Sequence, residues 1–94
     1  MAGDEDTALR IDKWLWRARF FKARSGAAAA AEKGFRLNGD RSQKAHQRIR
    51  PGDVLTFRQA GEVRVVRVLA LGERRGSAAE AAALYLDLEP EAGD

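Results

Sequence analysis

Apolar residues in the first quarter of the chain recur with the spacing of an α-helix. One shared face is formed by four of them, Ile11, Trp14, Leu15 and Ala18. The pattern predicts a first helix over Asp12–Phe20, with the Asp12 carboxylate capping its free N–H groups. We assign Trp14 to the core, because large apolar side chains are buried more often than exposed.

A run of five alanines, Ala27–Ala31, predicts a second helix over Gly26–Lys33, because alanine has the highest intrinsic helix propensity. Ser25 is the expected N-cap, and Gly34 is the expected left-handed residue just beyond the helix end. The link over Phe21–Arg24 is short, so the two helices should meet in a tight helix–turn–helix corner.

The pattern then changes from helical to β. Asn38-Gly39 is a strong signal for a type I′ turn and predicts a hairpin between strands at Phe35–Leu37 and Asp40–Ser42. The polar and basic run Lys44–Arg50 is expected to form a loop or a single helical turn.

Alternating apolar and polar residues continue the β pattern. The expected elements are a turn at Pro51–Asp53, a strand over Val54–Arg58, a hairpin turn at Gln59–Glu62 and a strand over Val63–Leu71. In the last strand the apolar parity changes between Val65 and Val66. This change indicates a β-bulge, a strand buried on both faces, or an incidental choice of residues.

Near the C-terminus, Ser77 followed by Glu80 matches a capping box and predicts a helix over Ala78–Tyr85. Together the patterns predict an α+β fold, with two or three short helices packed on a small, mainly antiparallel, strongly twisted sheet. The expected organisation is a flexible acidic leader at 1–8, one domain at 9–71, and an extension with a short helix and an acidic tail at 72–94.

Positive charge is concentrated in one part of the chain. The whole sequence of 94 residues has a net charge of +3, but residues 10–50 contain 12 basic and three acidic side chains, a net charge of +9. Such a concentration is typical of a surface that binds a polyanion.

Several function classes find no support in the composition. The sequence has no cysteine, which excludes disulfides, thiolate zinc sites and cysteine nucleophiles. No apolar run reaches the ~20 residues of a membrane helix, and the acidic N-terminus is unlike a secretory signal, so we expect a cytoplasmic protein. His46 has no companion ligands, and no phosphate loop or nucleophile elbow is visible. We therefore expect no catalytic residue, no metal and no cofactor.

Four short motifs occur in the order and spacing of a known family. They are Arg10–Trp16, Lys22–Ser25, Leu37–Gly39 and Pro51–Leu55. Over about Leu9–Leu69 the chain resembles the S-four-type RNA-binding domain, in which helices and hairpin form the αL RNA-binding motif. The resemblance implies a protein that binds structured RNA, in particular ribosomal RNA, and that is not an enzyme.

Two further segments, Trp14–Lys22 and Glu73–Tyr85, resemble the heat-shock protein fifteen family, small ribosome-associated proteins of bacteria. That resemblance implies binding to free large ribosomal subunits that still hold a nascent chain on transfer RNA, and a role in recycling them after heat stress. Members of the family continue in a basic tail, whereas this sequence ends in the acidic segment Glu89–Asp94.

RNA is held through its phosphates by arginine and lysine, and through exposed bases by aromatic stacking. Six candidates for these contacts belong to the helical corner: Arg10, Lys13, Arg17, Lys22, Arg24 and Ser25. Four belong to the hairpin and the loop after it: Arg36, Asn38, Arg41 and Lys44. Ser25 is included because the start of a helix offers free N–H groups to a phosphate.

Some of these residues have a structural alternative. Trp16 and Phe20 either stack on bases or join the core, and Asn38 fits turn chemistry better than RNA contact. Asp12 fits a helix cap or an arginine partner better than a catalytic acid.

Two other functions compete with RNA binding. A basic helix–turn–helix is also compatible with nonspecific DNA binding or a DNA-binding regulator, although the alanine-rich second helix has few side chains that could read base edges. The second competing function is that of an adaptor whose basic face binds an acidic protein. The expected assembly is a monomer with no membrane contact.

Overall fold

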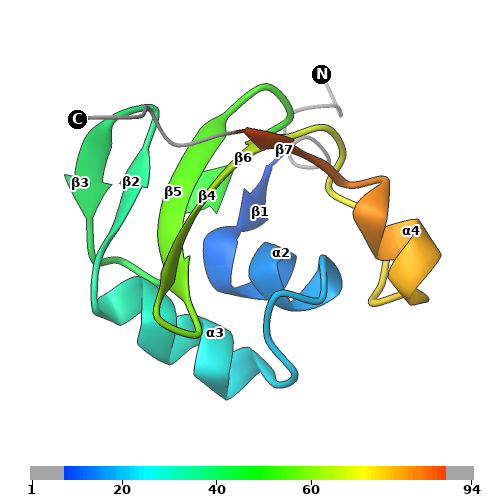
Figure 1. Ribbon diagram of the computed structural model, residues 1–94, viewed down its shortest axis with the longest axis horizontal. Helices are drawn as coiled ribbons and strands as arrows, with labels where there is room; N and C mark the ends of the chain where they lie inside the picture. The colour runs from blue at the N-terminus through cyan, green and yellow to red at the C-terminus, as the bar shows by residue number, and fades with distance from the viewer. Residues whose placement is uncertain (1–7, 89–94) are drawn as a thin grey trace.

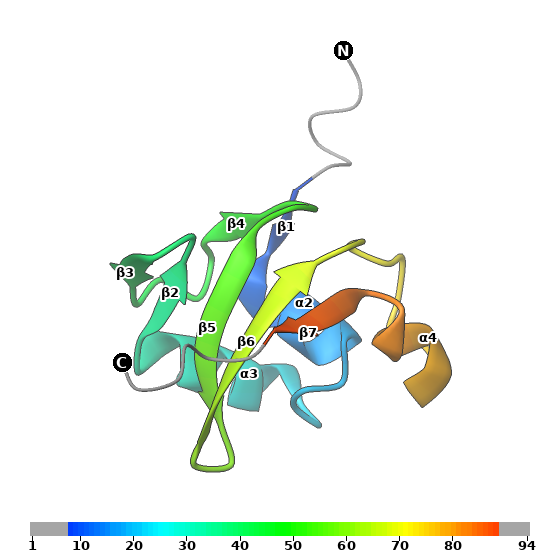
Figure 2. The same ribbon diagram turned by 45° about the horizontal axis from the view of Figure 1, so that its top comes forward.

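The computed structural model describes residues 8–88. Residues 1–7 of the predicted leader and the acidic tail 89–94 lie outside the described residues. Within residues 8–88, three short helices pack with a five-stranded sheet in which all neighbouring strands are antiparallel. The predicted fold class is therefore confirmed. Figures 1 and 2 show α2 and α3 on one side of the twisted sheet and α4 beyond its β7 edge.

The helices are α2 (Ile11–Arg17), α3 (Arg24–Glu32) and α4 (Ala78–Ala82). The sheet has the order β3-β2-β5-β6-β7, formed by Asp40–Ser42, Phe35–Leu37, Val54–Gln59, Glu62–Val68 and Tyr85–Leu88. A separate two-stranded ladder joins β1 (Leu9–Arg10) to β4 (Arg48–Ile49). Within residues 8–88 no helix is long and apolar enough to cross a membrane.

The first helix begins without a side-chain cap, so the prediction that Asp12 caps it was wrong. Arg10 is the N-cap residue and makes no side-chain cap hydrogen bond. Instead, the amides of Ile11 and Asp12 donate to the carbonyls of Gln47 and Ala45, at 2.8 and 3.3 Å. A distant loop therefore satisfies the orphan N–H groups that a cap would otherwise satisfy.

The first helix also ends earlier than predicted, at Arg17 rather than Phe20. Arg19 has a positive φ of 65°, and the Phe20 amide reaches back to the Leu15 carbonyl at 3.0 Å. This geometry is a Schellman ending, which usually takes glycine. Phe20 is consequently turned into the core, where 6% of its surface is exposed, and is not available to stack on a base.

The second helix begins two residues before its predicted start, and Ser25 is not its cap. Ala23 is the N-cap residue, in an extended conformation, and forms no side-chain cap bond. Ser25 is the second residue of the helix. Ala27 and Ala31 form its buried face, and Gly34 follows with the expected positive φ.

Local turn signals predicted the hairpins correctly. The β2 and β3 strands have the predicted bounds, and Asn38 and Gly39 both have positive φ, as a type I′ turn requires. The run Lys44–Arg50 is only partly a loop, because Arg48–Ile49 forms β4. That short strand was missed because its partner, β1, lies almost forty residues away.

The β5 and β6 strands pair without interruption from Val54↔Arg67 to Gln59↔Glu62. No bulge therefore accompanies the parity change in the sequence. Val66 and Val68 are fully buried, whereas Val63 lies on the outer face with 43% of its surface exposed. Both faces of β6 thus carry valine, but the core is on one side.

The final helix is shorter than predicted, and a strand follows it that the sequence analysis missed. The Ser77–Glu80 capping box is present in both directions, but α4 ends at Ala82 rather than Tyr85. Tyr85–Leu88 forms β7 at the edge of the sheet, paired with β6. The segment 72–88 is therefore integrated with the rest of the fold.

Trp14 joins the helical corner to the sheet. Its side chain is fully buried, contacts the rings of Phe20 and Tyr85, and donates its indole N–H to the Ala70 carbonyl at 2.9 Å. The core assignment of Trp14 is thus confirmed. Trp16, by contrast, is half-buried under the Arg75 guanidinium, 5.7 Å from the ring centroid.

Replacing Trp14 by phenylalanine is expected to lower the free energy of unfolding by about 2–3 kcal/mol, because the change leaves a void and an unpaired Ala70 carbonyl. Trp16→Phe is the matched control and should cost less than about 1 kcal/mol, since that ring is only partly buried. Urea unfolding followed by circular dichroism measures both. Equal losses for the two variants would show that Trp14 has no special role.

Candidate nucleic-acid interface

A buried carboxylate organises the helical part of the predicted site. Asp12, 3% exposed, accepts hydrogen bonds from Arg10 Nε and Nη2, at 3.1 and 2.8 Å, and lies 3.7 Å from Arg24 Nη2. It therefore fits the arginine-partner alternative. Arg10 precedes α2 and Arg24 opens α3, so Asp12 brings together the basic ends of two helices. Both guanidinium groups remain about half-exposed and can meet a phosphate.

Arg17 is turned toward the protein rather than toward solvent. Its Nη1 donates to the Gly72 carbonyl at 2.6 Å, and its Nε is buried without a partner among the described residues. Burial, followed by the positive charge of Arg24, lowers the pKa of the Arg17 guanidinium. Arg17 thus holds the connection between β6 and α4 in place. Fewer of its N–H groups are free to contact a ligand than those of a fully exposed arginine.

The remaining helical candidates lie on or near the same corner. Lys13 is half-buried on α2, and Lys22 is exposed in the link between the helices. Ser25 is exposed on the first turn of α3, where its hydroxyl makes no cap bond.

The hairpin supplies a second basic group. Arg36 and Arg41 are directly paired across β2 and β3, and both are exposed. Asn38 serves the turn, as expected: its Nδ2 donates to Asp53, and its Oδ1 accepts from the Val54 amide at 2.8 Å. Lys44 lines a hollow with Arg41 in the loop after the hairpin.

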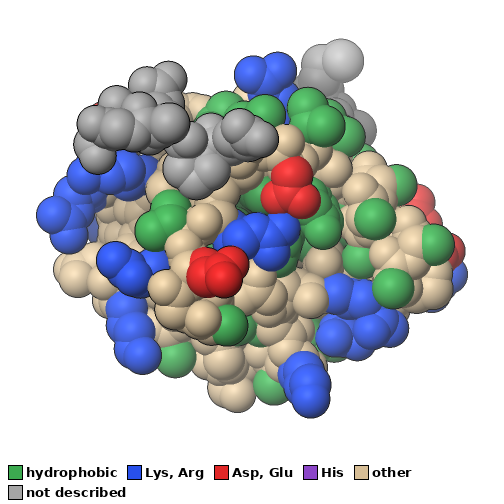
Figure 3. Space-filling model, in the orientation of Figure 1, with side chains coloured by type: hydrophobic (Ala, Val, Ile, Leu, Met, Phe, Trp, Pro, Cys, Tyr) green, Lys and Arg blue, Asp and Glu red, His purple; other side chains and the backbone are tan. Residues whose placement is uncertain are grey.

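The loop after the hairpin connects the two basic groups. Its Ala45 carbonyl accepts from the Asp12 amide, and Arg48 lies opposite Arg10 in the β1–β4 ladder. Arg48 is exposed and lies on this surface, but no sequence pattern identifies it, because only the ladder places it beside Arg10. Figure 3 shows Lys and Arg side chains gathered on the side where β2, β3 and α3 lie.

The surface consists of separate exposed cations with few carboxylates, an arrangement that suits contact with phosphates. Within residues 8–88, no group of three or more His, Cys, Asp or Glu side chains could hold a metal ion. Two clusters of positive charge, one on the helical corner and one on the hairpin, suit a polyanion that spans both.

A family model described as the S4 domain matches residues 9–55. The chain belongs to the S4 domain family. The matched segment contains all ten candidate residues, from Arg10 to Lys44. The resemblance to RNA-binding domains of the S-four type is thereby confirmed, and the basic corner and hairpin lie in the part of the chain that carries it.

Named relatives extend the comparison. The chain is 45% identical over 78 residues to heat shock protein 15 of Escherichia coli K12, covering 82% of this chain and 58% of the relative. It is 38% identical over 81 residues to a homologue in Haemophilus influenzae, covering 86% and 62%. The chain thus spans about 60% of the length of these relatives.

A solved structure supports the same relation. The Vibrio cholerae heat shock protein 15, described as trimeric, superimposes with a TM-score of 0.78 and 34% sequence identity. The match covers 86% of this chain and 82% of that one. The likeness therefore extends over most of both chains.

Asp12→Asn is expected to lower the free energy of unfolding by about 1–2 kcal/mol at low salt, because it removes the carboxylate that offsets the charges of Arg10 and Arg24. Added salt should reduce this loss, since it screens the repulsion between the arginines. The exposed Asp40→Asn is the control and should change stability by less than about 0.5 kcal/mol. A loss that is independent of salt would argue against the electrostatic role of Asp12.

Proposed function

We propose that this chain binds structured ribosomal RNA through the helical corner and the β2–β3 hairpin. The observation that carries the proposal is the pair of basic clusters, linked by the 43–47 loop, inside the S4 segment. Arg10 and Arg24 are fixed in position by Asp12, so they lose little side-chain entropy on meeting a phosphate. Arg36 and Arg41 provide a second contact on the rigid hairpin.

The proposed contacts are weighted by what each side chain does in the fold. Arg24, Arg41 and Lys44 are exposed and lie at the two clusters, so they should contribute most to affinity. Arg17 contributes less, because its guanidinium is engaged with Gly72. Arg10, Lys13, Lys22, Ser25 and Arg36 complete the proposed surface, while Asn38 acts by holding the turn.

The proposal extends from RNA binding to a role on the ribosome. The relatives are named heat shock protein 15. The segments Trp14–Lys22 and Glu73–Tyr85 resemble that family. In this role the chain binds free large subunits that carry a stalled nascent chain and helps to recycle them under heat stress. The surface described here contacts ribosomal RNA, and the protein acts by binding rather than by catalysis.

Replacing Arg24 and Arg41 together by glutamine should weaken binding to a blunt-ended RNA hairpin by at least about tenfold and flatten the salt dependence by about 2 in log–log slope, because each phosphate contact contributes about 0.9. Fluorescence anisotropy at several salt concentrations measures both quantities. The control is Arg67→Gln with Arg74→Gln, which removes the same charge from exposed positions beyond the S4 segment.

Two outcomes would contradict this assignment. Equal weakening by the control pair would show that net charge, and not this surface, carries binding. Equal competition by duplex DNA and by the RNA hairpin would support the nonspecific DNA-binding alternative. The exposed side chains of α3 are mostly small, so sequence-specific reading of a DNA groove is not favoured.

In a bacterial lysate, the tagged protein should sediment with free large subunits more than with whole ribosomes, and the Arg24/Arg41 double variant should remain near the top of the gradient. Comigration with neither particle would overturn the ribosomal role while leaving RNA binding open. The free protein in the same gradient also tests the expectation of a monomer, against the trimer described for the Vibrio cholerae relative.

A further inference from the structure

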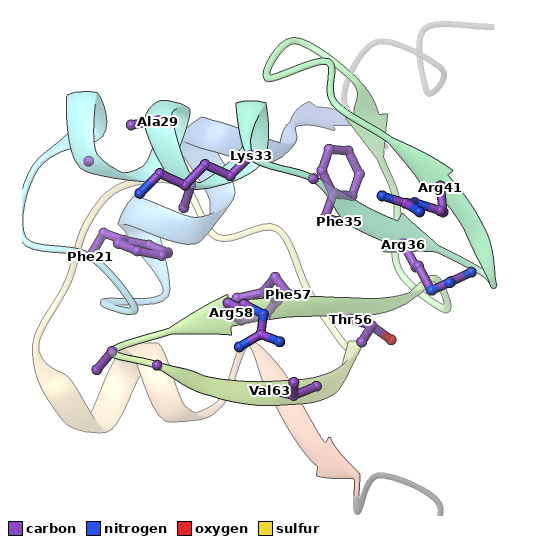
Figure 4. Close-up of a pocket in the computed structure, with 15 residues that line it drawn as sticks. Phe21, Ala29, Lys33, Phe35, Arg36, Arg41, Thr56, Phe57, Arg58 and Val63 are labelled. Atoms are coloured by element: carbon purple, nitrogen blue, oxygen red, sulfur yellow. The ribbon is translucent and has the colours of Figure 1, made fainter. Parts of the chain in front are cut away.

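A surface groove lies between α3 and the β5–β6 hairpin, and it shares only Arg36 and Arg41 with the proposed RNA surface. The groove has a volume of about 700 Å³. Figure 4 shows its aromatic residues: Phe21 at one end, with Phe35 and Phe57 between the helix and the strands. Phe35 and Phe57 are buried in the core, whereas Phe21 is half-buried.

The groove exists because small residues line the facing side of α3. Gly26, Ala29 and Ala30 are spaced three and four positions apart and therefore share one face of the helix. Ala60 and Gly61, in the turn of the opposing hairpin, are also small. These small residues leave space between α3 and the hairpin turn, while Ala27 and Ala31 hold the other face of α3 in the core.

Four cations line the groove: Lys33, Arg36, Arg41 and Arg58. Figure 4 shows Lys33 on the helix side and Arg58 on the strand side, with Arg36 and Arg41 at the hairpin end. The lining contains no Asp or Glu, and within residues 8–88 none of the four forms a salt bridge. The charge of the groove is thus uncompensated by the described part of the chain.

This combination suits one kind of occupant. A strand of nucleic acid places a charged phosphate beside each flat, weakly polar base, and proteins bind single strands with basic grooves and aromatic side chains. Arg36 and Arg41 also belong to the proposed hairpin surface, so a strand leaving that surface would enter the groove at its basic end. Its bases would then lie toward Phe21 and the alanines of α3.

We propose that this groove binds an unpaired RNA segment that continues from the structured RNA held by the hairpin, a proposal that rests on the proposed function above. Lys33 and Arg58 bind its phosphates from opposite sides, and Phe21 contacts a base. The protein therefore recognises a junction between paired and unpaired RNA rather than a duplex alone.

The test compares a blunt RNA hairpin with the same hairpin carrying a single-stranded uridine extension. The wild-type protein should bind the extended RNA about tenfold more tightly, since one base contact contributes about that much. Lys33→Gln with Arg58→Gln should abolish this gain and leave affinity for the blunt hairpin unchanged. Ala30→Leu should do the same by filling the groove, without any change of charge.

Two matched controls accompany these variants. Arg67→Gln with Arg74→Gln removes the same charge elsewhere, and Ala82→Leu adds the same bulk at an exposed position of α4. Both control variants should still bind the extended RNA more tightly than the blunt hairpin, by the same factor as the wild-type protein. Circular dichroism verifies that each variant is folded.

Failure of the groove proposal can be distinguished from failure of RNA binding itself. If the wild-type protein binds both RNAs with equal affinity, the groove proposal is overturned and the proposed function stands. If it binds neither RNA, both are overturned. A gain that survives in either groove variant also overturns the groove proposal, since the extension then contacts another surface.

Discussion

The buried indole of Trp14 is the contact on which the rest of this small fold depends. It contacts the rings of Phe20 and Tyr85 and donates its N–H to the Ala70 carbonyl, so one side chain joins α2, the sheet and the connection that leads to α4. A domain of this size has a thin core, in which one large side chain accounts for much of the buried apolar surface. The orientation of α2, and hence of its basic residues, follows from this contact.

Arginines at the end of α2, just beyond it and in the connection to α4 reinforce the same junction. Arg17 and Arg19 donate to the carbonyls of Gly72 and Gly76, at 2.6 and 2.7 Å, and Arg75 donates back to the Trp16 carbonyl. These charge-assisted bonds occupy backbone carbonyls in a connection with little regular structure. Part of the positive charge of the chain is therefore structural, and the charge available to a ligand is smaller than a count of basic residues suggests.

The remaining cations are distributed so that one surface can meet RNA at several points. Asp12 holds Arg10 and Arg24 at the helical corner, and the hairpin presents Arg36 and Arg41. The groove extends the hairpin cluster toward Lys33 and Arg58. A ligand that is rigid and paired at one end and flexible at the other would use this whole surface, because duplex phosphates suit spaced cations and an unpaired strand suits an apolar groove.

Local signals in the sequence determined much of this architecture. The type I′ turn at Asn38-Gly39 and the Ser77–Glu80 capping box depend on residues no more than three positions apart, and both are present. The apolar face of α2 predicted the core position of Trp14 in the same way. The motifs of the S4 segment were visible for the same reason, since each is short and continuous.

Contacts between distant residues decided the rest. The loop before β4 supplies the carbonyls that begin α2, so the expected Asp12 cap was not needed and its carboxylate pairs with arginines instead. Pairing with β6 converts the end of the predicted last helix into β7. Whether an arginine holds the fold or faces a ligand also depends on which carbonyls lie nearby. The sequence by itself determined the local turns, the face of α2 that is buried in the core, and the sign of the surface charge. Only the tertiary structure decided which charged side chains remain free to contact a ligand. The physical reason is that folding alone brings together hydrogen-bond partners that lie far apart in the chain.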